Sequence, residues 1–195
     1  MNRIALALSL LLAQNVFAST HTVDASHSNV TFQIRHLVSK VTGNFKEFEG
    51  EFNFDEKAID KTTATFSVKT ASIDTNSAKR DEHLRSPDFF DVQKFDKMTF
   101  KSTVIKKGGA KKFKMTGDLT LHGVTKAVTF DVEYNGASVD PWGNQRRGFT
   151  ATSQINRKDF GIVWNKNLDA GGVMLGDDVK ISIEIEGVEK KEEKK

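Results

Sequence analysis

The chain has 195 residues, a formal net charge of +3, 15 phenylalanines, one tyrosine, two tryptophans and no cysteine. The missing cysteine excludes disulfide bonds and thiol chemistry. The small, mixed charge argues against a nucleic-acid-binding surface, which needs clustered lysine and arginine. Phenylalanine has no polar group, so most of these rings must be buried, either in a packed core or around an apolar cavity.

Residues 1–18 have the three-part pattern of a secretory signal peptide. Arg3 gives a short basic start, the apolar run 4–13 follows, and Ala18 stands at a small-residue cleavage position. A membrane anchor would need about 20 apolar residues, and the polar pair 14–15 interrupts the run too early. We therefore expect cleavage after Ala18, export, and no membrane-spanning segment in the mature chain.

Alternation of apolar and polar residues dominates the rest of the chain, which is typical of half-buried β-strands. The eight stretches that alternate in this way are residues 30–34, 48–54, 64–68, 98–104, 113–121, 128–134, 149–155 and 181–185. A short extra strand at 20–23 is also considered. Glycine-containing turn signals separate several stretches, so neighbouring strands should be antiparallel.

About eight such strands can bury one face either as a two-sheet sandwich or as a closed barrel. Gly43, Gly50, Gly117 and Gly148 lie within or beside the predicted strands. Glycine at such positions allows the bulges and sharp bends that a coiled barrel sheet needs. We therefore favour a single all-β barrel domain.

The first interruption of the alternation, residues 77–91, predicts a short helix. Ser77 is suited to cap it, and Ser86 followed by proline is suited to restart a helical turn. Its apolar residues, Leu84, Phe89 and Phe90, should pack against one end of the barrel.

Three further segments lie outside the predicted strands. Residues 157–159 should form a turn in which Arg157 could pair with a carboxylate. Residues 161–178 are rich in glycine yet apolar, and loops of this length usually have a function, so we expect a lid or a mouth. The lysine- and glutamate-rich residues 189–195 predict a charged, disordered tail.

Clear catalytic or metal-binding patterns are missing from the sequence. The five histidines lack the spacing of a zinc enzyme, and no nucleophile elbow or phosphate-binding loop is present. The cluster Arg80-Asp81-Glu82-His83 could be a polar clamp or an acid/base set at the barrel mouth. Alternatively, it could be surface groups and ion pairs that tie the helix to a neighbouring strand. We favour the second interpretation and expect no catalytic residue and no metal.

Six motifs in series resemble the YceI-like family, the polyisoprenoid-binding proteins of bacteria. The motifs lie at residues 24–36, 43–50, 72–90, 117–126, 155–161 and 176–179. The most distinctive one is 72–90, which begins with Ser72-Ile-Asp74 and continues from Arg80 through His83 to Phe90. Together they cover about residues 20–188, nearly the whole mature chain.

This resemblance implies a lipocalin-like, extended eight-stranded antiparallel β-barrel with one or two short helices, formed by residues 19–188. It also implies a periplasmic location and an isoprenoid chain, or a similar long amphiphile, inside the barrel. A bound isoprenoid or isoprenoid quinone would be the ligand, without a separate cofactor. The family brings no catalytic residues, so we expect a protein that is not an enzyme.

Simple energetics agree with a slim ligand, because an eight-stranded barrel is just wide enough for its own side chains or for one narrow molecule. At about 0.8 kcal/mol per buried CH₂, a chain of about 15 carbons would contribute on the order of 12 kcal/mol before the cost of ordering it. The candidate ligand-binding residues are the inward ones of the predicted strands, which could equally form a plain core: Phe32, Ile34, Phe48, Phe52, Phe66, Phe100, Leu119, Phe130, Phe149 and Ile155.

Three functions therefore stay open. The first, which we favour, is carriage or storage of a long isoprenoid or fatty amphiphile. The second is a filled barrel without ligand that acts as a stress-linked or interaction protein. The third is an enzyme that uses Arg80, Asp81 and His83. A homodimer is compatible with each of them.

Overall fold

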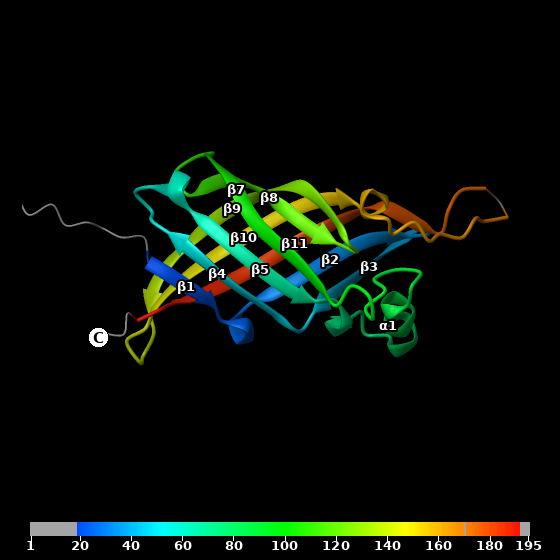
Figure 1. Ribbon diagram of the computed structural model, residues 1–195, viewed down its shortest axis with the longest axis horizontal. Helices are drawn as coiled ribbons and strands as arrows, with labels where there is room; N and C mark the ends of the chain where they lie inside the picture. Colours follow the sequence, from blue (N-terminus) through cyan, green and yellow to red (C-terminus); the bar gives the residue numbers. More distant parts are fainter. Residues whose placement is uncertain (1–18, 170, 192–195) are drawn as a thin grey trace, which may run out of the picture.

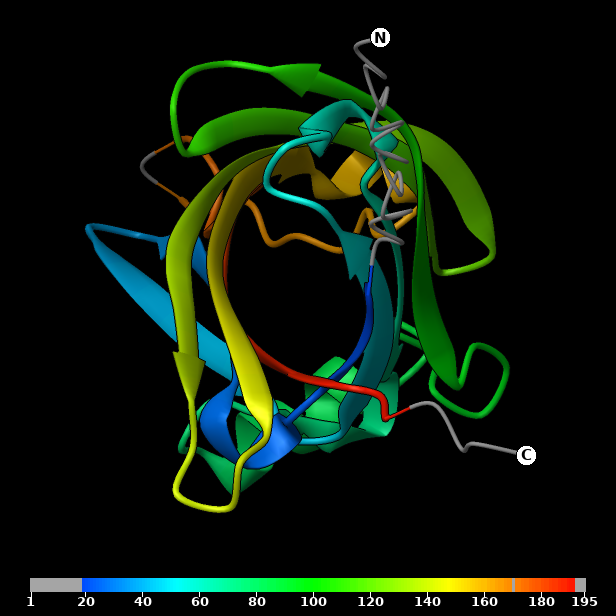
Figure 2. The same ribbon diagram turned by 90° about the vertical axis from the view of Figure 1, so that its left-hand side faces the viewer.

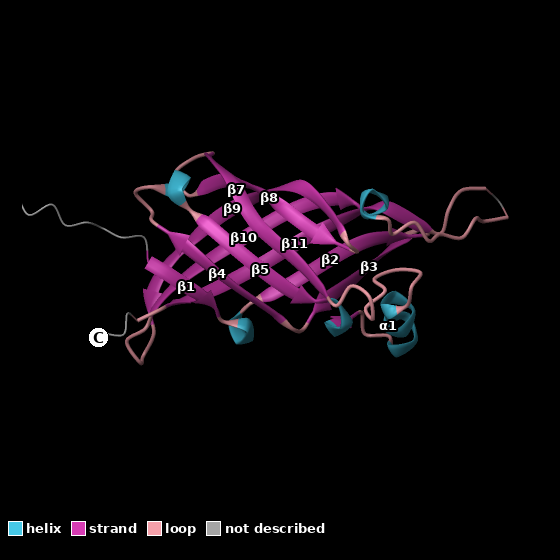
Figure 3. Cartoon of the chain, in the orientation of Figure 1, coloured by secondary structure: helices cyan, strands magenta, loops and turns pink. Residues whose placement is uncertain are grey.

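The computed structural model describes residues 19–169 and 171–191, which form one β-sheet wound into a barrel (Figure 1). The strands are β1 (Ser19–Val23), β2 (Asn29–His36), β3 (Ser39–Phe45), β4 (Phe48–Phe54), β5 (Thr63–Lys69), β6 (Ile73–Asp74), β7 (Lys97–Lys107), β8 (Lys112–Leu121), β9 (Val124–Val139), β10 (Gln145–Asn156) and β11 (Leu175–Glu189). The one α-helix in this part of the chain is α1 (Ala78–Arg85), and short 3-10 helices lie between strands (Figure 3).

The sheet closes on itself, so the barrel is observed and the sandwich is not. Its order is β1–β4–β5–β7–β8–β9–β10–β11, and β1 also pairs with β11, which completes a ring of eight antiparallel strands (Figure 2). The expected eight-stranded antiparallel barrel is therefore confirmed. A closed ring has no edge strand, because each of its eight members pairs with a neighbour on both sides over part of its length.

Strands β2, β3 and β6 extend the barrel wall beyond the ring. Strand β2 continues the path of β1 after the 3-10 helix Ala25–His27, and both pair with β11. In the same way, β3 pairs with β2 and β4 pairs with β1. Two long bent strands, β1–β2 and β3–β4, thus run side by side, and β6 adds a short pairing to β3.

The eight alternating stretches fall within β2, β4, β5 and β7 to β11, and the short strand considered at 20–23 is present as β1. Strand β3 was not predicted, because its first residues are polar or exposed and carry little alternation. In β7 the predicted parity fails after a bulge between Ser102 and Val104. Val104 is 47% exposed, and the half-buried Ile105 takes over the inward position.

The helical segment partly follows the prediction. Ser77 occupies the N-cap position of α1, but its side chain caps no backbone N–H. After Ser86 the chain makes turns and does not restart a helix. Leu84, Phe89 and Phe90 pack against the apolar interior, as expected.

The two ends of the barrel carry different elements. Helix α1 and the segment 161–174 lie at one end, on the right of Figure 1, which we call the α1 end. Strand β1 and the end of β11 lie at the opposite end. Here β11 runs through Glu189, and the Lys190 N–H donates to the Thr20 carbonyl at 2.8 Å, so residues 189 and 190 belong to the barrel and not to the predicted tail.

Some predicted features fall outside the described residues, namely the signal peptide at 1–18 and the last four residues of the tail. Among the helices that are described, none is both long and apolar enough to span a membrane.

Candidate functional site

A cavity of about 630 Å³ occupies the barrel interior. Most of its wall is formed by Phe, Leu, Ile, Val and Met side chains from the strands, from α1 and from the segment 161–174. A volume of this size lies within the range of small-molecule sites. The phenylalanine-rich interior is therefore not completely filled by its own side chains.

The structure places nine of the ten predicted ligand-binding residues on the cavity wall. These nine are Phe32, Ile34, Phe52, Phe66, Phe100, Leu119, Phe130, Phe149 and Ile155. Phe48 is the exception. It lies where β3 bends into β4, and its ring packs with the separate cluster of Val30, Phe45 and Ile73. That the other nine contact a ligand stays a prediction.

Glycines give the rings of the wall room to lie flat. A Cβ atom on Gly43 would come within 2.5 Å of the Phe32 ring, and one on Gly50 within 2.4 Å of the Phe66 ring. Such contacts are shorter than a side chain could tolerate, so each ring covers its glycine on the neighbouring strand. Of the glycines expected at bulges, Gly148 lies at one, whereas Gly43 and Gly50 serve this close packing instead.

The wall at the α1 end includes residues that we did not select from the sequence. These are Leu84, Phe89, Phe90, Ile162, Trp164, Met174 and Leu175. The sequence did contain a signal for them, because all seven belong to 77–91 and 161–178, the two apolar segments that interrupt the strand pattern. Period-2 alternation selects strand residues only, and it cannot show which residues of a loop line the cavity.

The end opposite α1 is closed by a group of aromatic rings, Phe52, Phe54, Tyr134 and Phe149, which we call the aromatic plug. The Phe54 ring lies 4.8 Å from Tyr134 and 4.9 Å from Phe149, measured between centroids. The Phe52 ring is 5.2 Å from that of Phe149. These separations are those of favourable aromatic pairs, and Phe54 is only 1% exposed.

His21 extends this plug as a fully buried side chain stacked on Phe52, with ring centroids 5.0 Å apart. Arg147 donates to its Nε2 at 3.2 Å, so Nδ1 carries the proton and donates to the Ser19 carbonyl at 3.0 Å. Burial lowers the pKa of His21, and the positive charge of Arg147 acts in the same direction. His21 is thus a neutral core histidine.

Arg157 holds the base of the segment 161–174 in place at the α1 end. This buried side chain donates to the carbonyls of Gly176, Ile162 and Trp164 at 2.7 to 2.9 Å and pairs with Asp177 at 3.2 Å. Burial lowers its pKa, and the carboxylate of Asp177 opposes that shift. The expected pairing of Arg157 with a carboxylate is present, and its main partners are backbone carbonyls.

The cluster Arg80-Asp81-Glu82-His83 does not converge on one point. Arg80 donates to the Thr75 hydroxyl and carbonyl, and buried Asp81 accepts from the Thr75 N–H and hydroxyl. His83 lies 2.8 Å from Asp88 instead. The cluster therefore ties α1 to the preceding loop, mostly by hydrogen bonds and not by the ion pairs that we expected. Arg80 and His83 also line the cavity.

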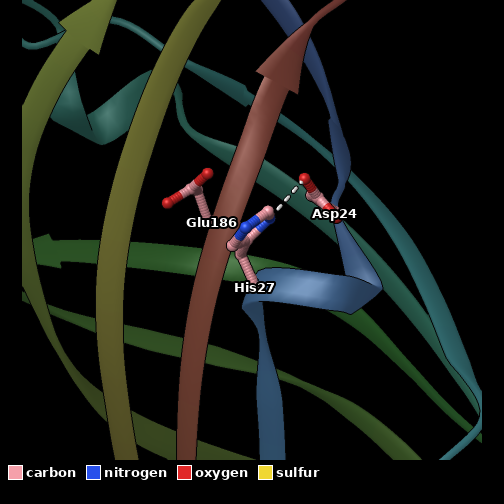
Figure 4. A group of neighbouring side chains, drawn as sticks. All are labelled: Asp24, His27 and Glu186. Carbon is pink, nitrogen blue, oxygen red and sulfur yellow. Dashed lines mark hydrogen bonds and ion pairs between the residues drawn. The ribbon is translucent and has the colours of Figure 1, made fainter. Parts of the chain in front are cut away.

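One group of side chains at the other end has the spacing of a metal site. Asp24, His27 and Glu186 bring ligand atoms within 4.8 Å of one another (Figure 4). Arg146 donates to the carboxylates of both Asp24 and Glu186, and also to Asp140. Its guanidinium supplies the positive charge that these carboxylates require, so the group is an ion-pair network.

The family model described as the YceI-like domain matches residues 21–187. The chain belongs to the YceI-like family. A UPF0312 protein of Pseudomonas putida (strain W619) is 40% identical to this YceI-like protein over 191 residues, which cover 96% of each chain.

Two solved structures share the fold of this YceI-like protein. The Campylobacter jejuni YCEI protein has a TM-score of 0.68 at 34% identity and covers 81% of this chain and 91% of its own. A polyisoprenoid binding domain from Saccharophagus degradans has a TM-score of 0.63 at 15% identity, with coverage of 89% and 99%. The second likeness supports the barrel architecture alone.

Proposed function

We propose that this YceI-like protein binds the chain of an isoprenoid, or of a similar long amphiphile, inside its barrel and carries or stores it. The observation that carries this proposal is the cavity of about 630 Å³, which is apolar along its length and closed by the aromatic plug. An apolar chain entering from the α1 end would replace contact with water by contact with Phe, Leu and Ile side chains.

The family supports a lipid as the ligand. A structural neighbour from Saccharophagus degradans is named a polyisoprenoid binding domain, and it has the same barrel. Export of this chain to the periplasm belongs to the same proposal and rests on the signal-peptide pattern of residues 1–18.

Binding without chemistry is the second part of the proposal. It is supported by the partners of the cluster Arg80-Asp81-Glu82-His83, of which Arg80 and His83 line the cavity. Asp81 is turned to Thr75, and His83 is turned to Asp88. A general base must reach the proton that it removes, and the carboxylate of Asp81, which accepts from Thr75, is not part of the cavity wall.

Native mass spectrometry of protein purified from its own host, before and after organic extraction, tests the proposal. We expect a reproducible lipid-sized mass increment that extraction removes. A bare polypeptide mass from the native host would contradict carriage and would favour the ligand-free interaction protein.

A matched pair of variants locates the ligand. Ala151 of β10 lines the cavity, whereas Thr152 is exposed on the outside of the same strand. We expect Ala151→Trp to fold but to lose at least about tenfold of its lipid occupancy, because the ring takes the volume of the chain. Thr152→Trp should keep both. Unchanged occupancy in Ala151→Trp, or loss of its fold, would show that the cavity does not hold the lipid.

A further inference from the structure

Positive charge gathers where the cavity wall reaches the α1 end. Among the described residues that line the cavity, the charged ones are Lys79, Arg80 and Arg157, and none is Asp or Glu. Lys79 and Arg80 are exposed, whereas Arg157 is buried. The charged side chains at this end of a mostly apolar cavity are therefore all positive.

Arg157 is already committed to the protein. Its donors bond to the carbonyls of Ile162 and Trp164 in the segment 161–174 and of Gly176 in β11, and its charge is balanced by Asp177 at 3.2 Å. It holds the wall in place and has little capacity left for a ligand.

Arg80 differs from Arg157, because it is held in position without an acidic partner. Its Nε donates to the Thr75 hydroxyl and its Nη2 to the Thr75 carbonyl, both at 2.7 Å. In the described part of the chain, Nη1 has no hydrogen-bond partner, and neither Arg80 nor Lys79 lies within ion-pair distance of a carboxylate. Two bonds to Thr75 fix the planar group, so less side-chain freedom is lost when it binds an anion.

The carboxylates near Arg80 are turned to other groups. Asp81 accepts from the N–H and the hydroxyl of Thr75, and Asp88 pairs with His83 at 2.8 Å. Glu82 is exposed and is not part of the cavity wall. The cavity end near α1 is therefore suited to a negative group that comes with the ligand.

We propose that Arg80 and Lys79 bind the anionic head group, a carboxylate or a phosphate, of the amphiphile whose chain fills the cavity. This inference rests on the proposed function and adds the chemical class of the head group and the direction of the ligand. The head lies at the α1 end, and the chain points toward the aromatic plug. Arginine presents several donors in one plane, which matches both oxyanions.

The test compares three probes that share a 16-carbon chain: palmitic acid, hexadecyl phosphate and hexadecanol. Their affinities for the delipidated protein are measured by native mass spectrometry or calorimetry. We expect the two anions to bind at least about tenfold more tightly than the alcohol, and the preference to shrink as salt is raised, because the cations are exposed. Preference for the phosphate or the carboxylate identifies which of the two oxyanions fits better.

Variants assign the preference to residues. The double change Lys79→Gln and Arg80→Gln should weaken the binding of both anions by about tenfold and leave the alcohol unchanged. Lys106→Gln with Lys107→Gln removes the same charge from β7, outside the cavity wall, and should change neither. Because Arg80→Gln also breaks the bonds to Thr75, Lys79→Gln alone is measured too. It leaves those bonds intact and should weaken anion binding by a few-fold.

The outcomes separate the inference from the proposed function. Equal binding of all three probes to the unaltered protein would overturn the head-group assignment and leave lipid binding intact. An anion preference that survives in the double variant would show that other residues bind the head group. Failure of all three probes to bind would contradict the proposed function itself.

Discussion

The two ends of the barrel are stabilised by different interactions. At the plugged end, aromatic rings pack against one another, and Phe54 and His21 are almost completely buried. At the α1 end, arginine side chains reach across to backbone carbonyls, as Arg157 and Arg85 do. Packed rings fill the interior at one end of the barrel. At the other end, hydrogen bonds join chain segments at a fixed distance without filling the space between them.

This difference explains how one barrel can be both stable and hollow. The plug supplies close packing at one end, and the hydrogen bonds at the α1 end position apolar side chains such as Trp164 and Leu84 on the cavity wall. Substitutions at the plug should therefore reduce global stability. Substitutions at the α1 end should act locally and on binding.

Truncating a plug ring should have the largest effect. We expect Phe54→Ala to lower the free energy of unfolding by about 3 to 5 kcal/mol, because it leaves a cavity among fully buried rings. Phe66→Ala, at the partly exposed cavity wall, should cost less than half as much, because its ring already borders empty space. Chemical denaturation of both variants checks this. Equal losses would mean that the two regions are packed alike.

Removing the hydrogen bonds that Arg157 makes at the α1 end should have a smaller effect. We expect Arg157→Met to cost about 2 kcal/mol, because the carbonyls of Ile162, Trp164 and Gly176 lose their donors. Hydrogen exchange should accelerate in residues 161–175 and stay unchanged in the plug. Lys158→Met is the control, because it removes the exposed partner of Asp177 and should cost less than about 0.5 kcal/mol. Uniformly faster exchange in Arg157→Met would argue against a local clamp.

The smallest expected effect is a pH dependence at the plugged end. Hydrogen bonds from Ser26 and then Arg146 hold the pKa of Asp24 well below its usual range. Burial raises the pKa of Asp140, but bonds from Asn144 and Arg146 outweigh it and keep that pKa low. Groups with a depressed pKa contribute stability above their unfolded pKa, near 4, and lose it as the pH falls toward the folded value.

The melting temperature should therefore rise between about pH 2 and pH 5. Arg146→Met should flatten that rise, because it removes the donor shared by Asp24 and Asp140. Thermal melts across this range provide the measurement, with Lys114→Met on the outer wall as a control. Identical slopes in Arg146→Met and the unaltered protein would show that this network does not contribute.

Much of the fold and of the cavity wall followed from the amino-acid sequence, because a strand that buries one face must alternate. The phase of alternation places Phe32, Phe66 and Phe130 inside whichever way the sheet closes. This local rule fails where the backbone departs from regular pleating. It placed Val104 inside, across a bulge, and Phe48 on the cavity wall, beside the bend between β3 and β4.

The sequence by itself determined an all-β chain with inward phenylalanines, two apolar interruptions and a family resemblance. Only the tertiary structure decided that the ring of strands closes and that aromatic rings fill one end. It also decided that Arg80 lies at the cavity wall, whereas Arg157 bonds to backbone carbonyls of the segment 161–174. The physical reason is distance along the chain. Alternation is a property of neighbouring residues, whereas a cavity depends on contacts such as that between Phe54 and Phe149, which join segments far apart in sequence.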